Sequence, residues 1–360
     1  MQTGHRVYFD SSTGMAITNN DSVDLVVTSP PYPMIAMWDE SFCATSGHVQ
    51  KALQDDDGNA AFEAMHRELD RVWSECYRVL RSGAFLCINI GDATRTVAGS
   101  FRLYSNHSRI VASCTALGFE ALPLILWRKQ TNAPNKFMGS GMLPSGAYVT
   151  LEHEYVLVFR KGGKRSFSTA DAERRRRSAF FWEERNRWFS DVWDFKGVRQ
   201  RVTGAEREGE DQPELRKRSA AFPFELASRL VCMYSLQGDT VLDPFLGTGT
   251  TTAAAVLHAR NSVGYEYSPD LEPVIDETIT KAVSRSSESV RDRLVAHAQF
   301  VEQAEASRGK PLGYTNTPHG VRVMTRQEIE LALPEVTDLR EQSADNVGLA
   351  YTMEHDLFRG

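Results

Sequence analysis

The chain of 360 residues has 41 Lys and Arg against 47 Asp and Glu, a formal net charge of −6 at pH 7, and 41% hydrophobic residues. A chain of this size can bury a core without a disulfide or metal staple. Its five cysteines include no C-x-x-C pair, and no charge-free stretch is long enough to cross a bilayer. We therefore expect a cytoplasmic protein with reduced thiols, without a metal and without membrane contact.

The first informative segment is the β-branched run 23–28, which leads into Ser29-Pro30-Pro31-Tyr32. This pattern predicts a buried strand that runs into a loop. The prolines remove backbone donors, so the loop carbonyls form a rigid row of acceptors beside an aromatic ring. An aminated base taken out of its stack fits there, with Tyr32 on its face and the Ser29 hydroxyl and Pro30 carbonyl accepting its amino protons. Taken alone, the loop is equally consistent with an ordinary proline turn.

Helices and strands alternate after this loop. The alternation predicts a doubly wound, mainly parallel α/β sheet. Segment 34–40 is predicted to form either a flap over the base or an apolar cover on the core. His153 beside Glu154 is interpreted as structural, because one such pair is poor metal-ligand geometry. The predicted elements are helices over 62–80, ended by Arg81-Ser82-Gly83, and over 108–117, and strands over 84–90, 122–127 and 155–159.

The periodic pattern stops between residues 160 and 218, where 17 Lys and Arg stand against 11 Asp and Glu. Arginines neutralise phosphates and bind guanine edges, so this basic stretch predicts a target-recognition insert. The alternative is a solvated basic loop, helical over 172–188, with its tryptophans packed on the core. The candidate DNA contacts are Arg174, Arg175, Arg176, Arg177, Arg185, Arg187, Lys196, Arg199 and Arg201.

A glycine turn follows next. A helix is predicted over 224–234, and a strand over 240–243 opens into Pro244-Phe245-Leu246-Gly247-Thr248-Gly249-Thr250-Thr251. The glycines let backbone N–H groups approach a ligand, and a helix amino terminus favours a carboxylate or phosphate. Glu266 ends the next predicted strand, 262–266, where a carboxylate can accept hydrogen bonds from both hydroxyls of a ribose. The spacing matches neither G-x-G-x-x-G nor the P-loop, so another nucleoside-containing cofactor is indicated. From residue 270 the chain is predicted to be helical to about 306 and irregular near 311–318.

The two motifs in this order, Ser29-Pro30-Pro31-Tyr32 early and the glycine turn late, resemble the beta class of DNA amino-methyltransferases. The resemblance covers residues 5–270 and implies S-adenosyl-L-methionine as cofactor and double-stranded DNA as substrate. It assigns catalysis to Ser29, Pro30, Pro31 and Tyr32. Serine at the head of the loop is typical of cytosine-N4 members and aspartate of adenine-N6 members, so the expected target is N4 of a flipped-out cytosine. The implied cofactor contacts are Asp10, Phe222, Asp243, Pro244, Phe245, Gly247, Thr248, Gly249 and Glu266.

One departure from the family pattern lies shortly before Phe222, where members often have a histidine and a proline and this chain has Arg218 and Ser219. The resemblance implies a catalytic half (1–163), the insert (164–214), a cofactor-binding half (215–270) and a helical C-terminal extension (271–360). The alternatives are adenine-N6 methylation of DNA, methylation of RNA or of a protein amide, and a catalytically silent DNA-binding subunit. A restriction endonuclease is a further expected partner unless the protein is an orphan enzyme, and both a monomer and a homodimer stay open.

Overall fold

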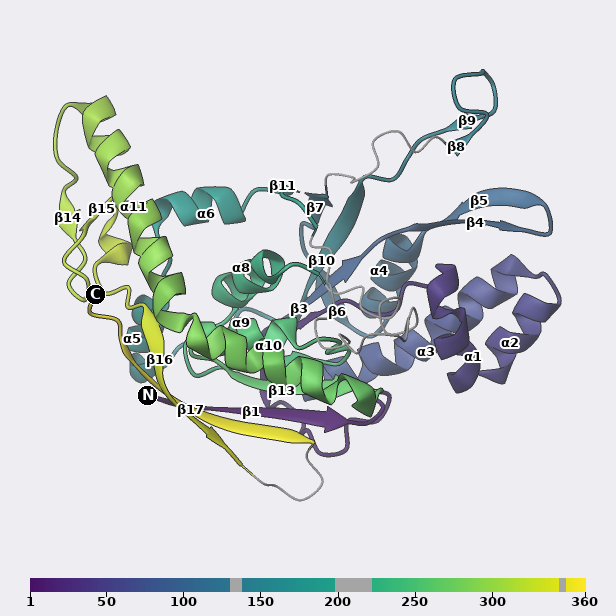
Figure 1. The fold of residues 1–360 in the computed structure, drawn as a ribbon, viewed down its shortest axis with the longest axis horizontal. Coiled ribbons are helices and arrows are strands. Elements are labelled where there is room, and N and C mark those ends of the chain that lie inside the picture. Colours follow the sequence, from purple (N-terminus) through teal and green to yellow (C-terminus); the bar gives the residue numbers. More distant parts are fainter. Residues whose placement is uncertain (130–137, 198–221, 343–347) are drawn as a thin grey trace, which may run out of the picture.

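The computed structural model describes residues 1–129, 138–197, 222–342 and 348–360 (Figure 1). One large sheet runs through these residues in the order β11-β7-β10-β3-β2-β12-β13-β1-β17-β16, with β6 paired to β10. Its strands are β1 (Gln2–Phe9), β2 (Val23–Thr28), β3 (Leu80–Ile90), β6 (Phe119–Ala121), β7 (Ile125–Arg128), β10 (His153–Lys161), β11 (Val192–Asp194), β12 (Thr240–Asp243), β13 (Asn261–Glu266), β16 (Pro334–Glu341) and β17 (Leu349–Leu357).

The centre of the sheet is parallel, as the sequence predicts. Strands β3, β2, β12, β13 and β1 are parallel neighbours, while β10 pairs antiparallel with β3 and β17 pairs antiparallel with β1. All six residues of β2 are buried, because helices cover both faces of the sheet. Val26 packs into the core on one face and Leu25 and Val27 into the core on the other. The predicted fold class is therefore confirmed.

The helices form one layer on each face. The long helix α3 and α4 share a core with Val26, whereas α8 and α9 share the opposite core with Leu25. Among the described residues, no helix combines the length and apolar character that a bilayer crossing needs. The helices are α1 (Asp39–Thr45), α2 (Gly47–Gln54), α3 (Gly58–Val79), α4 (Asn106–Ala116), α5 (Thr169–Arg177), α6 (Trp182–Trp188), α8 (Phe224–Tyr234), α9 (Thr250–Leu257), α10 (Glu272–Ser284) and α11 (Ser286–Arg308), with 3-10 turns η1 (Ala36–Trp38), η2 (Pro269–Leu271) and η3 (Arg326–Glu328).

Three short hairpins complete the described structure. Two of them project beyond the sheet at the same end of the molecule in Figure 1, and the third lies beside α11. The ring of Phe101 stacks on that of Tyr148 with centroids 4.6 Å apart, which joins the two projecting hairpins. The hairpins are β4 (Ala93–Val97) with β5 (Ser100–Tyr104), β8 (Met138–Gly139) with β9 (Ala147–Tyr148), and β14 (Tyr314–Thr315) with β15 (Arg322–Val323).

The structure differs from the predicted elements at the end of α3 and in the C-terminal extension. The expected helix stop at 81–83 lies inside β3, because the chain turns extended at Leu80 and pairs there with Val23, with a register shift before Leu25. The predicted C-terminal extension 271–360 is not helical throughout: α11 ends at Arg308, and beyond it β17 pairs with β1 and β16 pairs with β17. That pairing joins the two ends of the chain, which local sequence patterns do not encode.

Candidate active site

The carboxyl ends of the central parallel strands meet at one edge of the sheet. The catalytic loop follows β2, the glycine turn follows β12, and Glu266 ends β13. Asp10 directly follows β1, where Phe9 pairs in register with Glu266. The structure therefore brings the two predicted motifs to the same edge, which we call the catalytic edge.

Asp243 joins the two loops at this edge. Its Oδ1 accepts hydrogen bonds from Thr28 Oγ1 at 2.7 Å and from the Phe245 N–H at 3.0 Å. Its Oδ2 accepts one from Thr251 Oγ1 at 2.6 Å. The residue is 1% exposed, and burial raises the pKa of its carboxyl to about 6 against the lowering effect of these donors. The carboxylate thus bonds the catalytic strand to the cofactor loop.

Asn106 holds the end of the catalytic loop through two hydrogen bonds. Its side-chain amide donates to the Pro33 carbonyl at 3.1 Å and to the Gly91 carbonyl at 3.0 Å. Met34 then ends the loop at φ +66°, a left-handed conformation that non-glycine residues adopt rarely, and its side chain is buried in the core. The start of segment 34–40 is therefore apolar cover, the second of its two interpretations, whereas Met37 is 39% exposed.

The hydroxyl of Tyr32 lies in a polar network. It accepts hydrogen bonds from Ser29 Oγ at 3.2 Å and Asn89 Nδ2 at 2.9 Å, and it donates to Glu154 Oε2 at 2.9 Å. Asn89 Nδ2 also donates to the same Glu154 oxygen at 2.7 Å, and Lys129 Nζ pairs with the other one. Burial, together with the Glu154 charge, raises the pKa of Tyr32 well above its ordinary value. The tyrosine hydroxyl therefore keeps its proton at neutral pH.

Asn89, Glu154 and Lys129 were not among the predicted site residues. Asn89 and Glu154 are 2% and 6% exposed, each in a strand made mostly of apolar residues. A polar side chain within a buried strand usually has a specific hydrogen-bond partner. That exception to the apolar pattern was the available signal, and only the pairing of β10 with β3 shows that the two lie together.

Gly91 leaves room for the Tyr32 ring. A Cβ at Gly91 would lie 3.1 Å from Tyr32 Cε2 and 3.3 Å from Glu154 Cγ. Both distances are shorter than ordinary van der Waals contact, so any side chain here would press on the ring and on the carboxylate. The position of Tyr32 thus depends on a glycine at the end of β3.

The cofactor loop has the predicted features of a nucleoside site. Gly247 and Gly249 have φ of +55° and +86°, and α9 begins at Thr250. The Gly247 and Ser268 N–H groups each donate to one oxygen of Glu266 at 2.9 Å, and burial raises the pKa of that carboxyl. A carboxylate has about four acceptor positions, so Glu266 keeps capacity for ligand hydroxyls. This donor and acceptor set fits the cofactor that the sequence implies.

The other implied cofactor residues lie at the same edge. Phe222 is 6% exposed and packs with Leu25 and Val27 ahead of α8. Phe245 meets Trp73 edge-on, with ring centroids 6.0 Å apart. Pro244 and Thr248 complete the loop, and Asp10 is exposed at its end of the sheet.

The four-arginine run lies elsewhere. Arg174 Nη2 pairs at 3.2 Å with Asp239, which precedes the start of β12, and Arg165 pairs with the same carboxylate at 2.6 Å. Arg176 Nε pairs with Glu330 at 2.9 Å. Since Asp239 lies at the amino end of a strand whose carboxyl end carries the cofactor loop, α5 is at the opposite edge. The structure does not bring Arg174 to Arg177 together with the catalytic loop.

The rest of the basic segment returns toward the catalytic edge. The chain forms two helices, α5 and α6, rather than one over 172–188. Trp188 and Trp193 are buried, as the alternative predicts, whereas Trp182 is 40% exposed. Strand β11 runs parallel to β7, so Lys196 follows it on the catalytic edge and is exposed. Arg185 and Arg187 are exposed on α6. Arg199, Arg201, Arg218 and Ser219 lie outside the described residues.

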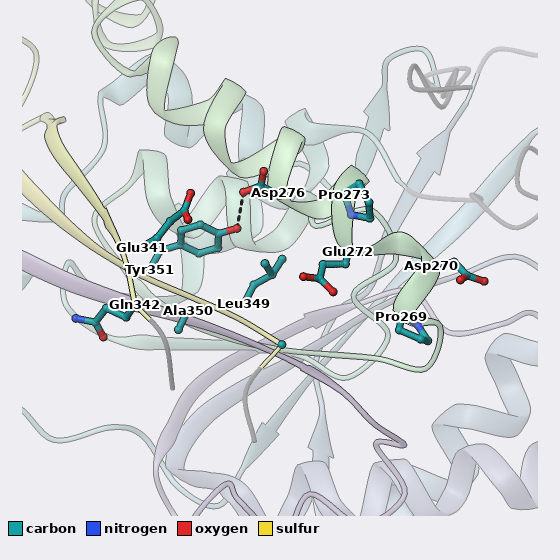
Figure 2. A pocket seen from close by; sticks show the side chains of 11 residues that line it. Pro269, Asp270, Glu272, Pro273, Asp276, Glu341, Gln342, Leu349, Ala350 and Tyr351 are labelled. Carbon is teal, nitrogen blue, oxygen red and sulfur yellow. Dashed lines mark hydrogen bonds between the residues drawn. The ribbon is translucent and has the colours of Figure 1, made fainter. Parts of the chain in front are cut away.

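A separate hollow lies on the β1–β17 side of the sheet (Figure 2). Carboxylates of Asp270, Glu272 and Glu341 line it, and the Tyr351 hydroxyl donates to Asp276 Oδ1 at 2.6 Å. An acidic lining repels phosphate groups. We therefore do not assign DNA binding to this hollow.

A family model for DNA methylases, N6_N4_Mtase, matches residues 23–277. The Type II methyltransferase M.MthZI of Methanothermobacter thermautotrophicus is 48% identical over 336 residues, which cover 92% of this chain and 91% of the relative. The Type II methyltransferase M.MjaI of Methanocaldococcus jannaschii is 46% identical, with 77% of this chain and 91% of the relative covered.

Two solved structures have a similar fold. TTHA0409 of Thermus thermophilus, in complex with S-adenosyl-L-methionine, superposes with a TM-score of 0.57 at 34% identity, covering 78% of this chain and 96% of that one. The PvuII DNA methyltransferase, which is cytosine-N4-specific, superposes with a TM-score of 0.51 at 15% identity, covering 79% and 93%. The second likeness supports the fold alone.

Proposed function

This chain belongs to the N6_N4_Mtase family of DNA methylases, and from that premise we propose that it moves the methyl group of S-adenosyl-L-methionine to N4 of a cytosine flipped out of double-stranded DNA. The observation that carries the proposal is Asp243, hydrogen-bonded to both Thr28 and Thr251. Through it the serine-headed loop and the glycine turn form one site. Serine at position 29 favours cytosine over adenine through the family resemblance.

The chain's own residues would perform three tasks. The glycine turn Gly247 to Gly249 would let the cofactor approach the backbone closely, the start of α9 would hold its amino-acid end, and Glu266 would hold its ribose. Tyr32 would stack on the flipped base. When bound, S-adenosyl-L-methionine supplies a sulfonium methyl group that an amine nitrogen can attack. The Ser29 hydroxyl and the Pro30 carbonyl would accept the two amino protons and so direct the nitrogen lone pair.

The remaining site residues keep supporting roles in this proposal. Phe222, Pro244 and Phe245 would line the cofactor pocket, with Thr248 beside its amino-acid end and Asp10 near its base. Segments 1–163 and 215–270 would act as the catalytic and cofactor-binding halves, with 271–360 as an extension. The M.MthZI and M.MjaI relatives are Type II methyltransferases, which supports proposing a restriction endonuclease as a partner in the cell.

We place the DNA along the catalytic edge, where Lys196 is exposed. The stacked β4–β5 and β8–β9 hairpins extend from this edge, since β4 follows β3 and β9 precedes β10. The tip of the β8–β9 hairpin is apolar and open to solvent, with Met142 and Leu143 85% and 70% exposed. Apolar side chains that enter a base stack are a common means of distorting DNA. Within segment 164–214 this assigns target contacts to Lys196 rather than to the α5 arginines.

Mass spectrometry of nucleosides tests the proposal. Duplex DNA is incubated with the purified full-length protein and cofactor, digested, and assayed for both methylated bases. We expect N4-methylcytosine alone, and an almost complete loss of product in Tyr32→Ala with cofactor binding intact. If N6-methyladenine were the only product, the target would be adenine and the proposed cytosine target would be wrong. Product only on RNA or protein, or no cofactor binding at all, would contradict the proposed activity.

A further inference from the structure

Glu154 is a buried acid directly behind the catalytic loop. Its side chain is 7% exposed, and it accepts hydrogen bonds from Tyr32 Oη at 2.9 Å and Asn89 Nδ2 at 2.7 Å, while Lys129 Nζ pairs with its other oxygen. Lys129 is 44% exposed, so it stands between this carboxylate and solvent. Tyr32, Asn89 and Lys129 thus satisfy this buried carboxylate. The site therefore contains a negative charge that the proposed mechanism has not used.

The hydrogen bonds form a directed chain from the loop to this acid. Ser29 Oγ donates to Tyr32 Oη at 3.2 Å, and Tyr32 Oη donates to Glu154 Oε2. Asn89 donates to both Tyr32 Oη and Glu154 Oε2, which fixes the hydroxyl between them. Each hydroxyl along the chain can accept one proton while it gives up its own. The chain ends at a group that can keep a proton.

We propose that Glu154 is the terminal proton acceptor of the reaction and receives the proton through Ser29 and Tyr32. The inference rests on the proposed function, because it needs an amino group at Ser29. A nitrogen–carbon bond forms as the carbon–sulfur bond breaks and leaves its electron pair on sulfur. The methylated nitrogen then gives one proton to Ser29 Oγ, the Ser29 proton passes to Tyr32 Oη, and the Tyr32 proton passes to Glu154 Oε2. Glu154 becomes neutral, and its proton later leaves to water beside Lys129.

The chemistry of serine makes such an acceptor necessary. A serine hydroxyl can orient an amino group but is too weak a base to keep its proton, unlike a carboxylate in the same place. The high pKa of Tyr32, raised by burial and by the Glu154 charge, means that its hydroxyl relays a proton rather than staying ionised. Glu154 thus supplies, through two hydroxyls, the negative charge that the loop itself lacks.

A purely structural role for Glu154 is the competing interpretation, in which it only fixes the tyrosine ring for stacking. Tyr32→Phe separates the two, because it keeps the ring and removes the relayed proton. Glu154→Gln keeps the shape of the side chain and removes the charge. Glu152→Gln, two residues away and exposed, is the matched control.

The test is single-turnover methylation by the full-length protein at saturating cofactor and duplex DNA. We expect Tyr32→Phe and Glu154→Gln each to lower the rate about 100-fold, in the range of positioned proton transfer. The double variant should be no more than about threefold slower than the slower single variant, because both break one relay. Glu154→Asp should recover part of the rate, and Glu152→Gln should match the wild type.

A spectroscopic titration gives a readout that does not depend on turnover. The phenol absorbance of Tyr32, isolated as the difference from Tyr32→Phe, should titrate at lower pH in Glu154→Gln, because the repelling charge is gone. A rate within about threefold of wild type in Tyr32→Phe, or fully multiplicative effects in the double variant, would overturn the relay. If the wild type methylates only adenine, the proposed target fails, yet the same variants still decide the relay.

Discussion

The two edges of the central sheet both hold clusters of charge, and they differ in what those charges contact. At the catalytic edge, Asp243 and Glu154 are buried and bond the loops that carry the chemistry. At the opposite edge, the arginine-rich helix α5 pairs with Asp239 and Glu330 of the same chain. A run of like charge in a sequence can therefore form ion pairs within its own chain, away from the edge where we propose that DNA binds.

The largest expected effect is at the glycine turn. Gly247→Asp puts a carboxylate beside Glu266, whose Oε2 the Gly247 N–H contacts at 2.9 Å, and beside the proposed position of the cofactor carboxylate. Uncompensated charge in such a site costs several kcal/mol, so we expect cofactor affinity to fall about 100-fold or more. Isothermal titration calorimetry measures it. Gly313→Asp, at an exposed glycine with open space around it, is the control for added charge; unchanged affinity in Gly247→Asp would remove the cofactor from this turn.

A smaller effect, on the methylation rate, is expected from a substitution at Gly91, where the Tyr32 ring packs against the end of β3. Gly91→Ala brings a methyl group 3.1 Å from Tyr32 Cε2, so the ring must shift by a few tenths of an ångström. Misplacement on this scale should slow methylation about tenfold while cofactor affinity stays unchanged. Pre-steady-state kinetics and calorimetry separate the two. A wild-type rate in this variant would show that Tyr32 does not need its present position.

The pH dependence of stability tests the role of Asp243. Its pKa is about 6 in the folded protein because of burial, above the ordinary value of 3.8. Its contribution to stability is thus present below pH 4 and lost as the pH rises through 6. Between pH 5 and 8 this amounts to about 1 kcal/mol that Asp243→Asn should no longer lose. Urea unfolding of both proteins at the two pH values gives the difference, and equal pH dependence would contradict the elevated pKa.

The smallest effects concern DNA binding and compare the two edges directly. Lys196→Ala should weaken DNA binding severalfold and reduce the salt slope by about one, because one phosphate contact is lost. Arg175→Ala on α5, an exposed residue at the other edge, should leave both quantities unchanged. Fluorescence anisotropy over a salt series measures both. Weaker binding in Arg175→Ala together with unchanged binding in Lys196→Ala would indicate that the α5 arginines contact DNA.

Local sequence patterns predicted the parts of the molecule that local chemistry determines. The strand 23–28 matches β2 residue for residue, and helices α3 and α8 follow their apolar periodicity. The glycine turn could be predicted because backbone conformations with positive φ favour glycine. Glu266 could be predicted because it is an acidic residue at the end of a predicted strand. The family resemblance, and not periodicity, supplied the order of the two motifs and the choice of cytosine.

The features that the sequence did not predict depend on contacts between segments that are distant in the chain. Glu154 and Asn89 become neighbours only because β10 pairs antiparallel with β3. Asp239 could not be recognised from the sequence as the partner of Arg174, because only the fold brings α5 next to the start of β12. The pairing of β17 with β1 likewise joins residues more than three hundred positions apart. Such pairings follow from the whole fold rather than from any local window.

The central claim is that the serine-headed loop and the glycine turn form one site that methylates cytosine N4 in DNA. Modification-sensitive sequencing of DNA from cells that express this protein tests it most directly, because it reports the base and its context together. We predict N4-methylcytosine in one recurring sequence context, absent when Ser29→Ala or Gly247→Asp is expressed instead. Methylation confined to adenine, or the same cytosine modification in cells that express Gly247→Asp, would contradict this account.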